Sequence, residues 1–355
     1  MVCSPQIRPD STNPRAPGQR LDTRGRRRYE QIVLRVHIVY EIEPGPLALL
    51  RERLAREIDL SRGPDIPADT EILVHGFPKH DQIAAAARLR ALVIPFAGVP
   101  LMTRGVMRLH PRVAVHNLHY NAAPTAESAV ALLLAAAKNL LPMDRRFRTH
   151  VWAPPPGGDP AVLLEGKTAL ILGYGEVGRR VARACVALGL RVVATRRTGP
   201  LRDGEIEVRG ADELRALLPQ ADALIICLPE TAETAGLIGE KELGLLPPGA
   251  LLVNIARGAI VDEDALYLAL KERRLRGAGL DVWYRYPPSA DRKSGRPSPP
   301  SNQPFHELDN VVMTPHRAGW SDETELARST FLAELLNHTA RGEPLPNRVD
   351  LARGY

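Results

Sequence analysis

Short apolar runs alternate with segments of helical spacing along most of the chain, from Tyr29 onward. Strands that are buried on both faces carry nearly continuous runs of Val, Ile, Leu and Ala, and their alternation with helices indicates a parallel sheet. In the first part of the chain this pattern predicts strands at 32–40, 71–74 and 92–96, and helices at 47–58 and 81–92. These elements make one small α/β unit.

A second and longer series follows 152–160, a stretch rich in proline and glycine that we interpret as a connector. The predicted strands of this series cover 168–173, 190–195, 223–228, 250–256, 277–283 and 310–314. The predicted helices cover 176–188, 211–218 and 262–273, with a last helix at 322–341. Residues 287–304, rich in Pro, Ser and Arg, are expected to form a long loop. The series predicts a doubly wound sheet.

A helix rich in Ala and Leu is predicted between the two series, at 126–141, with Thr125 as its N-cap and Glu127 in its first turn. Apolar residues cover nearly every face of this helix, so we expect it to be buried. The pattern leaves three places open for it: the core of a domain, the boundary between two domains, and a dimer interface.

The length of 355 residues favours two domains, and 44% apolar with 25% charged residues is typical of a globular chain. No apolar stretch approaches the roughly 20 residues that a membrane-spanning helix needs. The basic N-terminus lacks the apolar segment of a secretory signal. Three scattered cysteines make neither a disulfide framework nor a zinc site. We therefore expect a cytoplasmic protein with no membrane partner and no bound metal.

The excess positive charge is concentrated in residues 1–28, which carry a net charge of +5 out of +6 for the whole chain. This segment is rich in polar residues and proline and lacks periodicity, so it cannot bury enough apolar surface to fold alone. We interpret it as a disordered basic tail rather than a nucleic-acid-binding arm, and we expect no nucleic-acid partner.

The sequence GYGEVG at 173–178 follows an apolar strand and opens an amphipathic helix, the context in which a G-x-G-x-x-G motif binds a dinucleotide. Gly173 permits the tight turn, Gly175 lets the backbone approach a pyrophosphate, and Gly178 lets the helix pack on the strand. Phosphates bind at the positive N-terminus of the helix, where Glu176 and Val177 lie. This context disfavours the alternative, a glycine turn that only reverses the chain.

The second strand of this series ends at Thr195, Arg196 and Arg197, where an acidic residue would bind the ribose hydroxyl of NAD. Two guanidinium groups suit a 2′-phosphate instead, because arginine pairs well with phosphate. We therefore expect NADP(H) to be preferred, with NAD(H) possible. The alternative is that both arginines are solvated surface residues.

Several ordered sequence blocks resemble the D-isomer-specific 2-hydroxyacid dehydrogenases, a family that includes hydroxypyruvate/glyoxylate reductases, phosphoglycerate dehydrogenases and formate dehydrogenases. The blocks are GYGEVGRRVA from Gly173, CLPETAETAGLI from Cys227, VNIARGAIVDEDAL from Val253, GAGLDVW from Gly277 and NVVMTPHRAG from Asn310, with AGV at 97–99 and NAAPTAE at 121–127 upstream. The resemblance implies a Rossmann nucleotide-binding domain at 125–319, inserted into a smaller, discontinuous substrate domain at 29–124 and 320–355. It also implies a homodimer.

The resemblance implies roles for individual residues. Arg257 would bind the carboxylate and carbonyl of the substrate, and His316 would donate or accept the proton. Gly98, Val99 and Asn121 would complete the substrate site. The residues implied in cofactor binding are Gly173, Gly175, Glu176, Val177, Gly178, Thr195, Arg196, Arg197, Leu228, Pro229, Ile255, Ala256, Asp281, His316 and Gly319, with Asp281 on the nicotinamide carboxamide. Arginine and histidine suit hydride transfer to a 2-oxo acid, because the developing negative charge needs a fixed cation and a proton source.

One position departs from the family pattern. The family has a glutamate, five residues after the nicotinamide-binding aspartate, that hydrogen-bonds the histidine and stabilises its protonated form; here this position is Tyr286. Glu307 or Asp309 could replace the missing carboxylate, although a structural role is favoured for both. Formate dehydrogenases also lack the glutamate, and their reaction moves a hydride without proton transfer by the histidine.

These observations predict an NADP-preferring oxidoreductase that interconverts a small 2-oxo acid and a D-2-hydroxy acid. Two alternatives stay open: a hydride-only dehydrogenase that acts on a formate-like acid, and a dinucleotide-binding sensor that has lost turnover. The presence of both Arg257 and His316 argues against the sensor.

Overall fold

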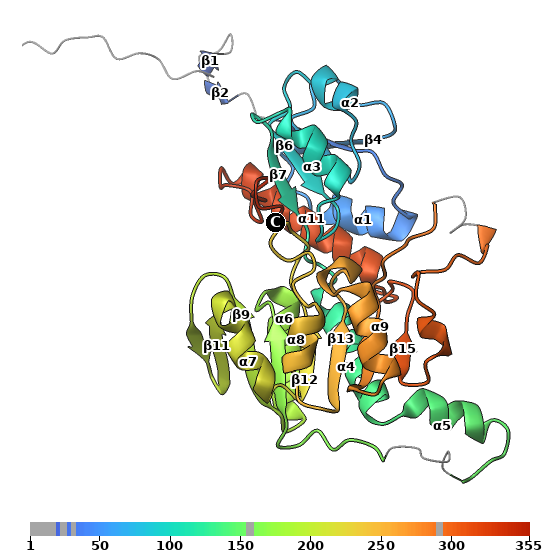
Figure 1. Cartoon of the computed structure of the whole chain (residues 1–355). Helices are drawn as coiled ribbons and strands as arrows, with labels where there is room; N and C mark the ends of the chain where they lie inside the picture. Colours follow the sequence, from blue (N-terminus) through green and yellow to red (C-terminus); the bar gives the residue numbers. More distant parts are fainter. Residues whose placement is uncertain (1–18, 22–26, 30–32, 154–159, 289–293) are drawn as a thin grey trace, which may run out of the picture.

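The chain folds into two α/β domains, each built on a parallel sheet, and this confirms the predicted fold class (Figure 1). The computed structural model describes residues 19–21, 27–29, 33–153, 160–288 and 294–355. The chain first forms most of the smaller domain, then the whole larger domain, and finally returns to the smaller domain with its last helix. The larger domain is therefore inserted into the smaller one.

The larger domain contains an eight-stranded sheet in the order β10-β11-β9-β8-β12-β13-β14-β15. Its strands are β8 (Thr168–Leu172), β9 (Arg191–Arg196), β10 (Leu201–Asp203), β11 (Ile206–Gly210), β12 (Ala223–Ile226), β13 (Ala250–Asn254), β14 (Leu275–Leu280) and β15 (Val311–Met313). Only β10 pairs antiparallel, with β11 at one edge. The chain winds from β8 toward one edge and from β12 toward the other, so the carboxyl ends of these two strands flank the point where doubly wound sheets bind ligands.

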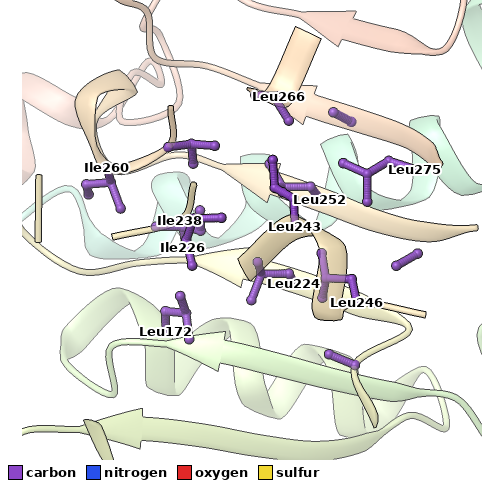
Figure 2. Packing of buried hydrophobic residues seen from close by; sticks show 14 of the residues in the cluster. Leu172, Leu224, Ile226, Ile238, Leu243, Leu246, Leu252, Ile260, Leu266 and Leu275 are labelled. Carbon is purple, nitrogen blue, oxygen red and sulfur yellow. The ribbon is translucent and has the colours of Figure 1, made fainter. Parts of the chain in front are cut away.

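Helices cover both faces of this sheet and enclose two apolar cores. The helices are α4 (Ala122–Ala137) and α6 (Glu176–Ala187) on one face, and α7 (Leu214–Leu217), α8 (Glu240–Leu245) and α9 (Glu263–Lys271) on the other. Short 3₁₀ turns lie at Ala211–Glu213, Leu218–Gln220, Gly258–Ile260 and Phe305–Glu307. Successive side chains of a strand point to opposite faces, so Ile171 joins the core under α6, whereas Leu172 joins the other core, shown in Figure 2.

The helix predicted at 126–141 packs directly on the larger sheet, as α4. It begins four residues earlier than predicted, with Asn121 as its N-cap residue, so the prediction of Thr125 as the cap is wrong. The Thr125 hydroxyl donates instead to the Asn121 carbonyl at 2.7 Å. Gly279 of β14 permits the close approach, because a Cβ there would lie 2.6 Å from the Cβ of Leu132. Of the three places left open by the pattern, α4 thus occupies the core of the larger domain.

The chain breaks its helix after α4. Asn139 adopts a left-handed conformation with a φ of 51°, and α5 (Leu140–Phe147) leaves at 65° to α4. In the part of the chain that the structure describes, no single helix has the length and apolar character to cross a membrane, and only the bent pair of α4 and α5 meets both criteria together.

The smaller domain contains a five-stranded parallel sheet in the order β4-β3-β5-β6-β7. Its elements are β3 (Leu34–Ile38), α1 (Pro44–Arg53), β4 (Ile58–Arg62), β5 (Ile72–Val74), α2 (His80–Ala85), β6 (Ala91–Ile94), α3 (Leu101–Arg108) and β7 (Ala114–Asn117). The last helix, α11 (Thr324–Ala340), lies beside α1 (Figure 1). Leu332 and Leu336 of α11 are fully buried in the core of this domain.

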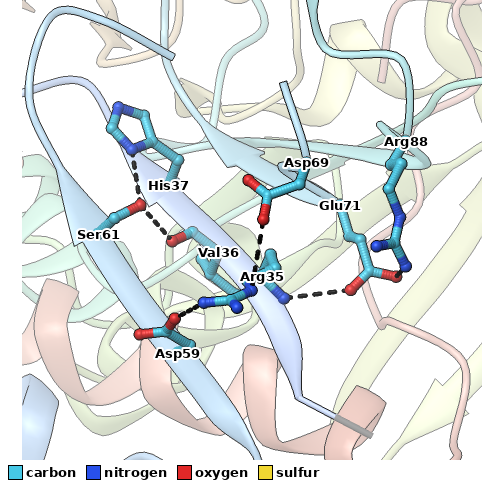
Figure 3. A network of polar contacts seen from close by, with 8 residues as sticks. All are labelled: Arg35, Val36, His37, Asp59, Ser61, Asp69, Glu71 and Arg88. Carbon is cyan, nitrogen blue, oxygen red and sulfur yellow. Dashed lines mark hydrogen bonds and ion pairs between the residues drawn. The ribbon is translucent and has the colours of Figure 1, made fainter. Parts of the chain in front are cut away.

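The edge strand β4 begins at Ile58, the last residue of the helix predicted at 47–58, and the pattern did not predict it. The predicted helix is correct only as far as Arg53. A network of polar contacts joins β4 and its surroundings to β3 (Figure 3). Arg35 of β3 forms an ion pair with Asp59, and its Nε lies 3.5 Å from Oδ2 of Asp69. The Ser61 hydroxyl of β4 lies 2.8 Å from Nδ1 of His37, a buried residue of β3. The sequence IDLSR of β4 is largely polar because an edge strand faces solvent, so it lacks the apolar run of a central strand.

Other differences from the predicted elements concern short segments. The helix predicted at 81–92 is found only as far as Ala85, and residues 91–94 belong to β6. The pattern did not predict α3, α5, α8, β7, β10 or β11, which range from three to eight residues in length. Such segments are too short to show a clear period of either 2 or 3.6 residues.

The predicted basic tail is described only at β1 (Gln19–Leu21) and β2 (Arg27–Tyr29), which pair antiparallel in a sheet of their own. The rest of the tail lies outside the described residues, so the expectation that residues 1–28 are disordered stays a prediction. Most of the predicted connector at 152–160 also lies outside them. The described residues of 287–304 contain no strand, in agreement with the predicted loop.

Candidate active site

A cavity of about 1660 Å³ lies between the two domains, at the carboxyl ends of the strands of the larger sheet. Most of the residues predicted for substrate or cofactor binding line it. These are Gly98, Val99, Asn121, Gly173, Gly175, Glu176, Val177, Thr195, Arg196, Arg197, Leu228, Pro229, Ala256, Arg257, His316 and Gly319. Tyr286, the position that departs from the family pattern, lines the cavity as well. Gly178, Ile255 and Asp281 do not line the cavity.

The glycine turn connects β8 to α6 and forms one wall of the cavity. Gly173 has a φ of 97°, and a Cβ there would lie 3.0 Å from the backbone of Cys227 and Leu228. A Cβ on Gly178 would collide with the Gly173 carbonyl oxygen, so Gly178 lets the helix pack against the turn. A Cβ on Gly175 would meet no atom within 4 Å, so its bare backbone opens onto the cavity. This cradle, at a helix N-terminus, fits the pyrophosphate of a dinucleotide.

Tyr174 fastens the glycine turn to the edge of the sheet. Its hydroxyl donates to Oδ2 of Asp203 on β10 at 2.7 Å. Burial, followed by this hydrogen bond, raises the pKa of Tyr174 to about 12, so the phenol stays neutral at physiological pH. The short strand β10 thus supports the turn although it lies at the sheet edge.

Two arginines lie at the end of the cavity next to β9. Nε of Arg196 donates to the Gly199 carbonyl at 2.7 Å. The loop that follows β9 therefore folds back around the Arg196 guanidinium. Arg197 donates to the hydroxyl of Tyr355, and its guanidinium carbon lies 4.8 Å from the centre of that ring. Tyr355 comes from the C-terminal segment of the smaller domain, which Figure 1 places at the junction of the two domains. Sequence analysis did not identify Tyr355.

Another part of the cavity wall combines the loop of Gly98 and Val99, from the smaller domain, with Arg257 of the larger domain. Among the described residues, the amides of Gly98 and Val99 donate to no protein acceptor. Their loop is fixed by Asn117, whose Nδ2 donates to the Ala97 carbonyl at 2.6 Å. The guanidinium of Arg257 packs so closely on Gly98 that a Cβ there would collide with Nη2. Two free amides beside a guanidinium form a site suited to a carboxylate.

Arg257 is positioned by the fully buried Asn254 at the end of β13. Nδ2 of Asn254 donates to the Arg257 carbonyl at 2.9 Å, and its Oδ1 accepts from the Ala256 amide at 3.1 Å. Nη1 of Arg257 donates to the Ala256 carbonyl at 2.6 Å. The amide side chain therefore fixes the backbone on both sides of the turn and directs the guanidinium across the cleft.

Asp281 organises the loop that carries His316. Its carboxylate is 1% exposed and accepts three hydrogen bonds, from the Thr314 hydroxyl at 2.6 Å, the Arg317 amide at 2.8 Å and the Ala318 amide at 2.9 Å. His316 itself adopts a left-handed conformation with a φ of 56°. The observed partners of Asp281 are thus groups of its own chain, and contact with a nicotinamide carboxamide stays a prediction.

We expect the Asp281→Ala variant to lose about 2 to 5 kcal/mol of stability, because two amides and a hydroxyl would lose a buried, charged acceptor. Urea unfolding followed by circular dichroism measures this loss. Asp309→Ala is the matched control, since Asp309 is exposed and pairs with the exposed Arg273 at 2.5 Å. A loss below 1 kcal/mol in Asp281→Ala would contradict the anchoring role.

Tyr286 lies directly against His316. The centres of their rings are 5.4 Å apart and the ring planes are inclined by 54°. The Tyr286 hydroxyl accepts from the Trp283 amide at 3.1 Å. Neither Glu307 nor Asp309 lines the cavity, and Asp309 pairs with Arg273. The position that carries a glutamate in the family is thus in contact with the imidazole here, but it supplies an aromatic ring.

Further residues of the cavity wall were not identified from the sequence. They include Arg104 on α3, Arg285, and Arg317 with Trp320, whose ring centre lies 4.2 Å from the Arg317 guanidinium carbon. The only available signal was proximity in sequence, because Arg104 follows the AGV block and the other three flank Tyr286 or His316. Among the described residues no group of three or more His, Cys, Asp or Glu side chains is arranged to hold a metal.

Comparisons with known proteins agree with this geometry. The family model described as D-isomer specific 2-hydroxyacid dehydrogenase, NAD binding domain, matches residues 130–318. The D-3-phosphoglycerate dehydrogenase of Archaeoglobus fulgidus is 35% identical over 304 residues, covering 85% of this chain and 54% of that protein. The glyoxylate reductase of Aeropyrum pernix is 39% identical over 234 residues, covering 64% of this chain and 66% of that protein. This chain thus spans about half the length of the first of these relatives.

A solved structure of the same family has a similar fold. The D-isomer specific 2-hydroxyacid dehydrogenase from Xanthobacter autotrophicus Py2, in complex with NADPH and MES, is 25% identical with a TM-score of 0.72. The match covers 90% of this chain and 99% of that chain. Since the family model matches more than half of the residues, this chain belongs to the D-isomer specific 2-hydroxyacid dehydrogenase family.

Proposed function

We propose that the protein is an NADP-preferring oxidoreductase that interconverts a small 2-oxo acid and a D-2-hydroxy acid by hydride transfer. One observation carries this proposal: a single cavity joins the glycine turn to an anion site made of Arg257 and the free amides of Gly98 and Val99, with His316 beside it. The relatives named D-3-phosphoglycerate dehydrogenase and glyoxylate reductase support the same type of substrate.

Each part of the cavity has a distinct task in this reaction. When bound, a nicotinamide dinucleotide supplies or accepts the hydride. The glycine turn would hold its pyrophosphate, and the arginines after β9 would hold the 2′-phosphate. Arg257 and the Gly98 and Val99 amides bind the substrate carboxylate, while the Arg257 guanidinium also stabilises negative charge on the carbonyl oxygen. His316 gives that oxygen its proton in reduction and removes it in oxidation.

The proposal is tested by following NADPH oxidation with a panel of 2-oxo acids and, in the reverse direction, NADP⁺ reduction with D-2-hydroxy acids and formate. Turnover of 2-oxo acids supports the proposal. Turnover of formate alone supports the hydride-only alternative. Tight NADPH binding without any turnover supports the sensor.

The homodimer implied by the resemblance also stays a prediction. The exposed apolar side chains of α5, which are Leu140, Met143 and Phe147, support it.

NADPH is expected to bind more tightly than NADH, and Arg196→Asp should remove this preference. Losing one charge-assisted hydrogen bond to the 2′-phosphate should weaken NADPH binding about ten- to a hundredfold. Isothermal titration with both cofactors measures the affinities. Arg202→Asp is a matched control, because Arg202 is an exposed arginine of β10 outside the cavity. Equal affinity of the unmodified protein for NADH and NADPH would contradict the preference.

Tyr286→Glu should extend 2-oxo acid reduction to higher pH. A carboxylate in contact with the imidazole favours its protonated form, which reduction consumes, so the basic limb of the pH–rate profile should move upward by about one unit. Tyr286→Gln has a similar shape without the charge and should leave this limb in place. A basic limb that already lies well above neutrality before substitution would show that another group stabilises the imidazolium.

A further inference from the structure

Arg104 lines the cavity close enough to Arg257 for the two charges to interact, and among the described residues no carboxylate forms an ion pair with it. It lies in the first turn of α3, directly after the loop that contains Gly98 and Val99. Its Nε donates to the Val99 carbonyl at 3.0 Å. Arg104 is therefore fixed to the same short loop whose free amides face the substrate carboxylate.

The rest of the Arg104 guanidinium reaches across the cleft. Nη1 and Nη2 lie 3.5 and 3.4 Å from the Glu230 carbonyl oxygen, at the long end of hydrogen-bond distances. Glu230 follows β12 and lines the same cavity. Arg104 also packs against Gly354, another residue of the cavity wall, where a Cβ would collide with Nη1. The guanidinium is thus held in place by carbonyl groups and packing, and it keeps hydrogen-bonding capacity toward the cavity.

The positively charged guanidinium groups of Arg104 and Arg257 repel each other in this cleft. Burial lowers the pKa of Arg104, the Glu230 carboxylate opposes this shift, and the positive charges of Arg257 and Arg108 add to it. A partly buried arginine stays charged, so this repulsion persists until an anion binds. One carboxylate is already accommodated by Arg257 and the amides of Gly98 and Val99. A second anionic group would compensate the second charge.

We propose that Arg104 binds a second acidic group, a carboxylate or a phosphate, on the substrate. This inference rests on the proposed function and specifies its substrate class: 2-oxo acids that carry a second negative group beyond the carboxylate next to the carbonyl. Arg257 binds the reacting end of the molecule, and Arg104 selects the distal group. The long contacts with Glu230 give way to charge-assisted bonds with that group, which are shorter and stronger.

The test compares substrates that differ only in the distal group. kcat/KM is measured for 2-oxoglutarate against 2-oxovalerate and for phosphohydroxypyruvate against hydroxypyruvate, in the unmodified protein and in Arg104→Met, Arg104→Lys and Arg108→Met. The unmodified protein should prefer the doubly acidic member of at least one pair, and the pair identifies carboxylate or phosphate. Arg104→Met should reduce this preference about tenfold or more. Arg104→Lys, which keeps the charge, should retain part of it.

Arg108→Met is the control for the helix, because Arg108 lies one turn further along α3 and outside the cavity, and it should keep the full preference. An Arg104→Met variant that loses activity equally on both members of each pair would assign Arg104 a role only in holding the domains together and would overturn the inference. A preference for the singly charged member in both pairs would also overturn it. If no 2-oxo acid is reduced at all, the proposed function fails, and the inference fails with it.

Discussion

The Arg257→Ala variant is expected to lose at least about a thousandfold in kcat/KM for 2-oxo acid reduction. Loss of a single donor to a developing oxyanion typically costs about 10²- to 10³-fold, and Arg257 is also placed to bind the substrate carboxylate. The loss should appear in both kcat and KM, because the carboxylate is bound before and during the reaction. Steady-state kinetics at saturating NADPH measure both constants.

The structure indicates that this variant keeps its fold. Asn254 fixes the turn through the backbone of residues 256 and 257, so the turn does not depend on the guanidinium. NADPH affinity and melting temperature should therefore stay close to those of the unmodified protein. Arg257→Lys tests the geometry, since an ammonium group cannot make the same paired contacts with a carboxylate. Full activity of Arg257→Ala would remove Arg257 from the mechanism.

The fold could be predicted from the sequence wherever strands are central. The strands β8, β12 and β13 are buried along their whole length, so their residues form apolar runs with polar residues, Thr168 and Asn254, only at strand ends. The glycine turn was predictable because the positive φ of Gly173 and the close packing of Gly178 leave little choice of residue. The edge strand β4 was not predictable, because its partners Arg35 and His37 hold it through polar contacts that no local pattern shows.

The site was only partly predictable for a related reason. Motifs identified Arg257 and His316, and the spacing after Asp281 correctly drew attention to Tyr286, which contacts the imidazole. The hydrogen-bond partners of Asp281 lie 33 to 37 residues away in the sequence, so its anchoring of the His316 loop could be found only in three dimensions. The same holds for Tyr355, which a distant segment brings to the cavity, whereas Arg104 lies close in sequence to the AGV block.

The second large effect is expected at His316. Its removal should slow 2-oxo acid reduction about 10²- to 10⁴-fold, the usual contribution of a positioned general acid. Asn is the preferred replacement, because His316 has a φ of 56° and asparagine tolerates this left-handed conformation better than alanine. His316→Asn therefore removes the acid while it preserves the loop that Asp281 holds through the Arg317 and Ala318 amides. The measurement is the rate of a single turnover with NADPH in excess.

The same variant separates proton transfer from hydride transfer alone. If His316 supplies a proton, the pH dependence of reduction should flatten in His316→Asn, and the solvent isotope effect should change. If the chemistry involves only hydride movement to or from a one-carbon acid, the imidazole serves mainly as a hydrogen-bond donor. Asparagine, which also donates, would then retain most of the rate. Tyr286 rather than a glutamate lies against the ring, so an unchanged rate of 2-oxo acid reduction in His316→Asn would show that a group other than His316 supplies the proton.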